Sequence, residues 1–306
     1  MKNILISGIT GFIGKNLERY LQNESKYQIW GVSRNPNKSN HINFNNIDNN
    51  GEFEVYIHLA GKAHDLKNST NPQEYYDVNT ELTIKLFDLF LISKSDLFIF
   101  LSSVKAVRDN IDTVLSEEAV PNPFSDYGKS KQLAEKYILN NSPKSKRVYI
   151  LRPCMVHGEG NKGNLTLLYN FVKKGIPYPL GAYTNKRSFL SIENLCFVIK
   201  ELIERDDIPS GVYHLADDDP VDTKSLIKLI SRTTNKNVPI WNLPKSIIRI
   251  IGKIGDFLFL PINTERIEKL TENYVVSNKK IKNALRKGLP ISTQAGLIKT
   301  IKSFEK

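Results

Sequence analysis

The chain has 306 residues, of which 40% are hydrophobic and 25% are charged. Its 43 Lys and Arg residues exceed its 32 Asp and Glu residues and give a formal net charge of +11. This balance is typical of a globular protein with one large α/β domain, or with one domain and a smaller lobe. Two cysteines cannot form the disulfide framework of a secreted scaffold, and no run reaches the roughly 20 apolar residues of a membrane span. We therefore expect a cytoplasmic protein.

The positive charge is concentrated towards the C-terminus, where residues 241–306 hold 13 Lys and Arg residues against five Asp and Glu residues. Such an excess favours an anionic substrate first and an anionic membrane surface second. The chain has no Arg-rich or aromatic-interleaved patch of the kind that binds nucleic acid. We expect no nucleic-acid partner.

Short apolar runs alternate with amphipathic segments through the first half of the chain, the pattern of βαβ units with a parallel sheet. The predicted strands are Asn3–Ser7, Gln28–Ser33, Val55–Ala60, Leu97–Ser102 and Val148–Arg152. The predicted helices between them are Phe12–Asn23, Asn79–Ser93 and Tyr127–Asn140. The fold class that follows is α/β, with a Rossmann-type doubly wound parallel sheet.

The second half has a looser rhythm with several Gly and Pro turns. One more strand is expected near residues 212–216, returning to the sheet, and a helix is expected at Lys224–Thr233. We therefore divide the chain into a nucleotide-binding domain at residues 1–153 and a smaller, mainly substrate-binding lobe at residues 154–306.

A glycine-rich turn with the spacing G-x-x-G-x-x-G follows the first predicted strand and opens the first helix. Gly8 permits a tight turn, Gly11 lets the backbone approach a pyrophosphate, and Gly14 lets the helix pack against the strand. The helix N-terminus offers unpaired N–H groups to the anion. We assign to dinucleotide binding the residues Gly8, Thr10, Gly11, Phe12, Ile13 and Gly14.

The end of the second strand bears on the choice of nicotinamide cofactor. An acidic side chain there suits the ribose hydroxyls of NAD, whereas an arginine suits the 2′-phosphate of NADP. The chain has Ser33 and Arg34 at this place and no acid. NADP(H) is therefore favoured, with NAD(H) as the alternative, and Asp48 in the following loop is a candidate contact to the adenine.

Tyr127 and Lys131 form a Y-x-x-x-K pair at the start of a predicted helix. The i, i+4 spacing places phenol and ammonium on one helix face, where the cation favours tyrosinate and lowers the phenol pKa. A tyrosine tuned in this way exchanges a proton with an alcohol or ketone. The spacing becomes specific when it is joined to the glycine turn and to Ser102-Ser103 at the end of an apolar strand.

With these motifs the sequence resembles the extended short-chain dehydrogenase/reductase family, in particular its sugar-nucleotide branch of 4-epimerases and 4-ketoreductases in bacterial surface-polysaccharide assembly. The resemblance covers nearly the whole chain. It is carried by Gly8/Gly11/Gly14, His58-Leu59-Ala60-Gly61, Val78-Asn79-Thr80, Ser102-Ser103, Tyr127/Lys131, Leu151-Arg152-Pro153, Lys162-Gly163-Asn164-Leu165 and Arg187-Ser188-Phe189.

The resemblance implies a role for each matching residue. Tyr127 would be the acid/base, Ser103 would position the reacting sugar oxygen, and Lys131 would tune the tyrosine and hold the nicotinamide ribose. Arg187 would pair with the substrate diphosphate, where an Arg fork fits phosphate oxygens, and Asn164 would also contact substrate. The residues implied to line the cofactor are Leu59, Ala60, Gly61 and Asn79.

Departures from the family pattern narrow the chemistry. Val104-Lys105 stands where the 4,6-dehydratases carry an Asp-Glu pair and where the GDP-sugar 3,5-epimerase/reductases carry a cysteine, so both reactions are disfavoured. Because Arg34 favours NADP(H), the leading hypothesis is reduction of the C4 ketone of a UDP-4-keto-6-deoxy-N-acetylhexosamine. The alternative is a UDP-N-acetylhexosamine or UDP-glucose 4-epimerase with bound NAD, and a non-catalytic NADP(H)-binding regulator is a distant third.

Two further segments attract notice. The run Asp217-Asp218-Asp219 is interpreted as a solvated turn, and we expect no metal site. The segment Lys245–Leu260 has a wide apolar face and a polar stripe with Arg249 and Lys253. It is interpreted as a lid helix packed into the lobe, with peripheral membrane contact at the inner face of the membrane or a subunit interface as alternatives. The resembling proteins are commonly homodimers.

Overall fold

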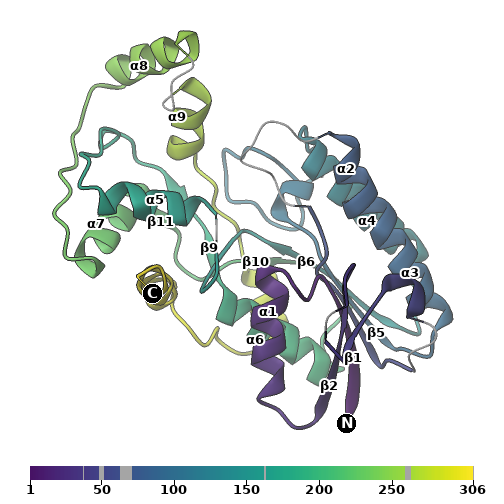
Figure 1. The fold of residues 1–306 in the computed structure, drawn as a ribbon. Helices are drawn as coiled ribbons and strands as arrows, with labels where there is room; N and C mark the ends of the chain where they lie inside the picture. Colours follow the sequence, from purple (N-terminus) through teal and green to yellow (C-terminus); the bar gives the residue numbers. More distant parts are fainter. Residues whose placement is uncertain (37, 48–51, 63–70, 162, 259–262, 306) are drawn as a thin grey trace.

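The computed structural model describes residues 1–36, 38–47, 52–62, 71–161, 163–258 and 263–305. At its centre is a parallel sheet with the strand order β3-β2-β1-β4-β5-β6-β10 (Figure 1). These strands are β1 (Lys2–Ser7), β2 (Tyr27–Val32), β3 (His41–Ile42), β4 (Val55–His58), β5 (Leu97–Leu101), β6 (Arg147–Pro153) and β10 (Gly211–Leu215). The order reverses between β1 and β4, and ligands of doubly wound sheets bind outside the carboxyl ends of the strands at such a point.

Helices cover both faces of this sheet, which confirms the predicted doubly wound α/β fold. On one face α1 (Phe12–Gln22), α6 (Ile192–Glu204) and α10 (Lys279–Leu285) bury their apolar sides in a common core. On the other face α3 (Leu82–Ile92) and α4 (Asp126–Asn141) pack around Phe87, Phe90 and Phe98 (Figure 1). Nearly continuous burial along the central strands follows from this double cover.

The remaining elements form a lobe with its own apolar core around Tyr169, Phe189 and Ile227. Its helices are α5 (Asn164–Lys173), α7 (Thr223–Thr233), α8 (Lys245–Phe257), α9 (Thr264–Thr271) and α11 (Thr293–Ser303). Two short sheets accompany them, β7 (Met155–His157) parallel to β9 (Phe189–Ser191), and β8 (Lys186–Arg187) antiparallel to β11 (Val221–Asp222). The chain passes between the two parts, since α6 and β10 lie beyond residue 154 but pack with the large sheet.

The helix predicted at Asn79–Ser93 begins earlier in the structure. It starts with α2 (Gln73–Tyr76), continues through a π-helical turn at Asp77–Glu81 and ends with α3. The sequence pattern did not predict the start of this helix, because its polar first turns have little apolar periodicity. The π-helical turn contains Asn79, and such turns are frequent at functional sites.

Candidate active site

The glycine turn lies at the carboxyl end of β1, next to the end of β4. Gly8 has a φ of +74°, and a Cβ there would lie 2.6 Å from the Ala60 nitrogen. A Cβ on Gly14 would lie 2.3 Å from the Gly8 carbonyl oxygen. Gly11 is the N-cap of α1 and supplies no side-chain hydrogen bond to it. The turn therefore brings β1, β4 and α1 into contact, and the uncapped first turn of α1 suits the pyrophosphate of a dinucleotide.

The residues predicted to select the cofactor lie just beyond β2. Ser33 is partly buried and its hydroxyl donates to the Asn35 carbonyl oxygen at 3.1 Å. Arg34 is exposed, and its guanidinium forms no hydrogen bond or ion pair with the residues that the structure describes. Asp48, the predicted adenine contact, lies outside the described residues.

The structure brings together the three residues predicted for catalysis. Ser103 follows β5, and Tyr127 and Lys131 lie in the first two turns of α4. The Ser103 hydroxyl lies next to the Tyr127 phenol, close enough to act on its ionisation. The Lys131 ammonium donates to the Leu101 carbonyl oxygen at 3.0 Å, so the lysine is anchored two residues before Ser103.

Gly61 and Asn79 complete this cluster from the end of β4 and from the π-helical turn. A Cβ on Gly61 would lie 2.9 Å from the Lys131 Nζ and 3.1 Å from the Asn79 Oδ1. The buried Asn79 amide accepts from the Lys62 nitrogen at 2.8 Å and donates to the Ser130 hydroxyl at 3.1 Å. Asn79, predicted as a cofactor contact, here holds the loop after β4 against α4. Leu59 and Ala60 begin this loop and lie against the glycine turn, since a Cβ on Gly8 would lie 2.9 Å from the Leu59 carbonyl carbon and 2.6 Å from the Ala60 nitrogen.

Burial controls the proton affinities of the pair. It raises the pKa of Tyr127, and the neighbouring Ser103 hydroxyl acts in the opposite direction. The direction is opposite to the lowering expected from Lys131, because desolvation of the tyrosinate is the largest effect and the charge of Glu135 acts in the same direction. Burial also lowers the pKa of Lys131 to about 8, while the charge of Glu135 acts to raise it. Both groups are therefore sensitive to any charge brought into the cluster.

Two residues that the sequence analysis missed set the distance between the Ser103 turn and α4. A Cβ on Gly128 would lie 2.5 Å from the Lys105 carbonyl oxygen, so glycine is required for this close approach. The buried carboxylate of Asp109 accepts from the Phe124 nitrogen at 2.7 Å and from the Ser125 hydroxyl at 2.5 Å. Ser125 in turn caps α4 by accepting from the Gly128 nitrogen. The sequence itself offered a signal for Gly128, because glycine weakens a helix and this one stands directly after Tyr127.

The other two predicted substrate residues, Arg187 and Asn164, lie in the lobe. Arg187 is in β8, where it forms an ion pair with Glu272, and its buried Nε has no hydrogen-bond partner among the described residues. An orphaned donor of this kind is costly unless a ligand or water satisfies it, which suits a phosphate oxygen. Asn164 is the exposed first residue of α5.

Behind the cluster lies a buried ion pair between α4 and β6. Arg152 donates to Glu135 through Nε at 2.9 Å and through Nη2 at 2.6 Å. The Ser102 hydroxyl also donates to Glu135. This pair fixes α4, which carries Tyr127 and Lys131, to the strands that end at the site.

The interpretation of Asp217 as part of a solvated turn was wrong. Asp217 is buried and accepts from the Ser191 nitrogen at 3.0 Å and from the Asn194 side chain at 2.7 Å. Its carboxylate thereby anchors the start of α6. Among the described residues, no group of three or more His, Cys, Asp or Glu side chains is placed to hold a metal ion.

His58, at the end of β4, is fully buried and stacks on Phe100. The Thr83 hydroxyl donates to the Asn79 carbonyl oxygen, so it accepts from the His58 Nε2 at 2.8 Å, and Nδ1 accepts from Ser7 at 2.5 Å. Both ring nitrogens are thus used by the neutral imidazole. Burial lowers the pKa of His58 to about 3, and it serves as packing beside the site.

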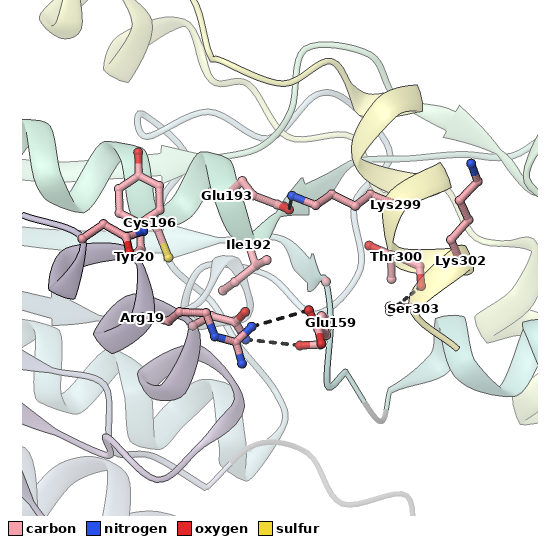
Figure 2. A pocket seen from close by; sticks show the side chains of 13 residues that line it. Arg19, Tyr20, Glu159, Ile192, Glu193, Cys196, Lys299, Thr300, Lys302 and Ser303 are labelled. Atoms are coloured by element: carbon pink, nitrogen blue, oxygen red, sulfur yellow. Dashed lines mark hydrogen bonds and ion pairs between the residues drawn. The ribbon is translucent and has the colours of Figure 1, made fainter. Parts of the chain in front are cut away.

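A separate cavity of about 430 Å³ lies between α1, α6 and α11 (Figure 2). Its two acidic groups face cations, Glu159 with Arg19 and Glu193 with Lys299. None of the residues predicted for cofactor, catalysis or substrate lines it. We therefore place the candidate active site at the carboxyl edge of the sheet and not in this cavity.

Comparison with known proteins agrees with this geometry. The model of the NAD dependent epimerase/dehydratase family matches residues 4–216. The chain belongs to this family. It is 32% identical to the UDP-glucose 4-epimerase of Vibrio cholerae, over 99% of this chain and 95% of that protein.

A second relative of this family member is the N-acetyl-alpha-D-glucosaminyl-diphospho-ditrans,octacis-undecaprenol 4-epimerase of Escherichia coli O157:H7, 26% identical over 92% of this chain and 84% of that protein. Among solved structures, the UDP-N-acetylglucosamine 4-epimerase from Bacillus cereus has the same fold, with a TM-score of 0.79, 17% identity and coverage of 100% of both chains. These matches confirm the predicted family, and with it an enzyme that uses a nicotinamide cofactor.

Proposed function

We propose that this enzyme is a 4-epimerase of a UDP-linked hexose or N-acetylhexosamine. The observation that carries the proposal is the placement of Ser103 next to Tyr127, with Lys131 one helical turn further along α4, at the sheet edge where the glycine turn lies. The full-length similarity to a UDP-glucose 4-epimerase supports reaction at C4 and supports the epimerase over the other reactions of the family.

The chain's own residues divide the work of proton transfer and binding. Tyr127 removes the proton of the C4 hydroxyl. It returns the proton after the intermediate ketone has rotated in the lobe. Ser103 holds the same oxygen through its hydroxyl, and protonated Lys131 stabilises the tyrosinate. A nicotinamide held at the glycine turn would provide the redox chemistry at C4, with the hydride first taken from C4 and then returned to it. Arg187 binds the diphosphate through its unpaired Nε.

The second candidate is the NADP(H)-dependent reduction of the C4 ketone of a UDP-4-keto-6-deoxy-N-acetylhexosamine. Arg34 favours it, because an exposed guanidinium at the end of β2 is available to a 2′-phosphate. A net reductase draws NADPH from solution, whereas an epimerase recycles the cofactor it holds. The same three catalytic residues serve both reactions.

One experiment separates the two candidates. The purified protein is incubated with UDP-glucose, UDP-GlcNAc and UDP-GalNAc without reductant, and separately with NADPH and UDP-4-keto-6-deoxy-GlcNAc. Interconversion of 4-epimers supports the first candidate, and stoichiometric loss of NADPH without interconversion replaces it by the second. Tyr127→Phe should abolish either activity, while Tyr137→Phe, on the same helix and bonded to Asp88, should retain it. Full activity of Tyr127→Phe would refute the assigned proton donor.

The proposal includes a cytoplasmic location and a homodimer. Exposed apolar side chains on the sheet-covering helices support the dimer, among them Ile92 at 81% exposure and Leu139 at 49%. Light scattering of the purified protein measures the mass directly, and a monomer at micromolar concentration would refute it.

A further inference from the structure

Helix α8 turns a wide apolar surface towards solvent. Figure 1 shows it at the far end of the lobe, beside α9 and away from the large sheet. The described part of this surface, which we name the α8 apolar face, consists of Ile247, Ile250, Ile251, Ile254, Phe257 and Leu258. Their exposure ranges from 38% at Ile251 to 80% at Phe257. The spacing places all six on one side of a helix.

A different side of α8 is used for packing. Its buried residues are Ile248, Gly252 and Gly255. A Cβ on Gly252 would lie 3.0 Å from the Ile267 side chain of α9, so the two helices are in close contact there. The helix predicted at Lys245–Leu260 does pack on the lobe, with Ile248 in its apolar core, but in the described part its wide apolar face is not the side that is buried. Contact with α9 leaves the α8 apolar face uncovered.

Basic side chains border this surface. Lys245, Arg249 and Lys253 are exposed and follow one another at intervals of four residues. The acidic residue of the helix, Asp256, is bonded to the nitrogen and hydroxyl of Thr264 in α9. A helix with an apolar side and a basic stripe is the pattern that lies in the interface of an anionic bilayer. A second copy fits less well, because a two-fold contact would bring two such stripes together.

We propose that the α8 apolar face inserts into the headgroup region of an anionic phospholipid bilayer, with Arg249 and Lys253 contacting lipid phosphates. The contact is peripheral, since no described helix is long and apolar enough to cross a membrane. It places the substrate lobe at the bilayer surface. The inference is independent of the reaction proposed above, since it rests on a surface outside the active site.

Vesicle sedimentation of the full-length protein tests the proposal. Binding is measured with vesicles of phosphatidylcholine and phosphatidylglycerol at 3:1 and with phosphatidylcholine alone. We expect binding to the anionic vesicles that falls at least tenfold in the triple variant Ile250→Ser, Ile254→Ser and Phe257→Ser. Arg249→Gln with Lys253→Gln should weaken binding and remove its dependence on salt.

The matched control replaces three exposed apolar residues elsewhere, with Ile176→Ser, Val114→Ser and Val120→Ser, and should bind as the parent protein does. Catalysis on soluble substrate should be unchanged in the α8 triple variant. A failure of the membrane proposal is therefore distinguishable from a failure of the proposed reaction. Absence of binding by the parent protein, or equal binding by the α8 triple variant, overturns the proposal. The proposal is also overturned if the parent protein binds no vesicles and the α8 triple variant loses a dimer. In that case the α8 apolar face contacts a second copy of the chain.

Discussion

The buried pair of Arg152 and Glu135 predicts a specific stability defect next to the active site. Arg152 is 5% exposed and Glu135 is 2% exposed. Hydrogen bonds of 2.9 and 2.6 Å join the two side chains. Arg152→Met removes one partner and leaves the carboxylate of Glu135 in a space from which water is excluded. An uncompensated buried charge of this kind costs about 3–5 kcal/mol. We expect this loss in the free energy of unfolding.

The double variant Arg152→Met with Glu135→Leu should be much less damaged. It removes both charges and leaves the hydroxyl of Ser102 without its acceptor, which costs about 1–3 kcal/mol. Equilibrium urea unfolding at pH 7.5, followed by circular dichroism, measures the four corners of the double-mutant cycle. A coupling energy near zero, or a loss below about 1 kcal/mol in Arg152→Met, would contradict the reasoning.

Three further predictions follow from buried groups. Gly14→Ala should lose most of its dinucleotide affinity in a fluorescence titration, whereas Gly288→Ala, whose Cβ meets nothing within 4 Å, should not. The lowered pKa of His58, about 3, means that the unfolded chain binds the proton first, so stability falls with pH below about 6.5. By pH 4 the loss is about 3 kcal/mol, and His58→Gln should abolish this part of the pH dependence in urea unfolding; an unchanged slope would exclude the histidine as its source. Burial raises the thiol pKa of Cys154 and Cys196, so neither should react with Ellman's reagent at pH 8 before unfolding.

Local patterns predicted much of the large domain. The apolar strands and the glycine turn were found because their signals lie within a few residues of each other. The placement of Tyr127 and Lys131 on successive turns of one helix follows in the same way from a local spacing, and α4 begins at Asp126. The tertiary structure adds the proximity of Ser103, which lies on a different element.

Features that depend on distant segments were missed or misread. Three consecutive carboxylates look like a solvated turn, but Asp217 is buried because it satisfies the start of α6, 26 residues earlier. Asp109 similarly caps a segment 15 and 16 residues later. The exposed side of α8 was misjudged because an apolar helix face predicts burial unless the partner is known.

The same distinction between local motifs and contacts across the chain applies to the candidate site. The residues for its chemistry lie in local motifs, and those for its substrate choice depend on distant segments. Ser103 and Tyr127 come from neighbouring elements of one domain, and their motifs are local. Arg187 is paired with Glu272, 85 residues later, and the Tyr274 hydroxyl donates to the Arg108 carbonyl oxygen across 166 residues. The second contact joins the segment after α9 to the loop that follows Ser103. The residues proposed for proton transfer are therefore encoded by short motifs, whereas the surroundings of the proposed substrate residue Arg187 are set by contacts between segments that are far apart in the chain.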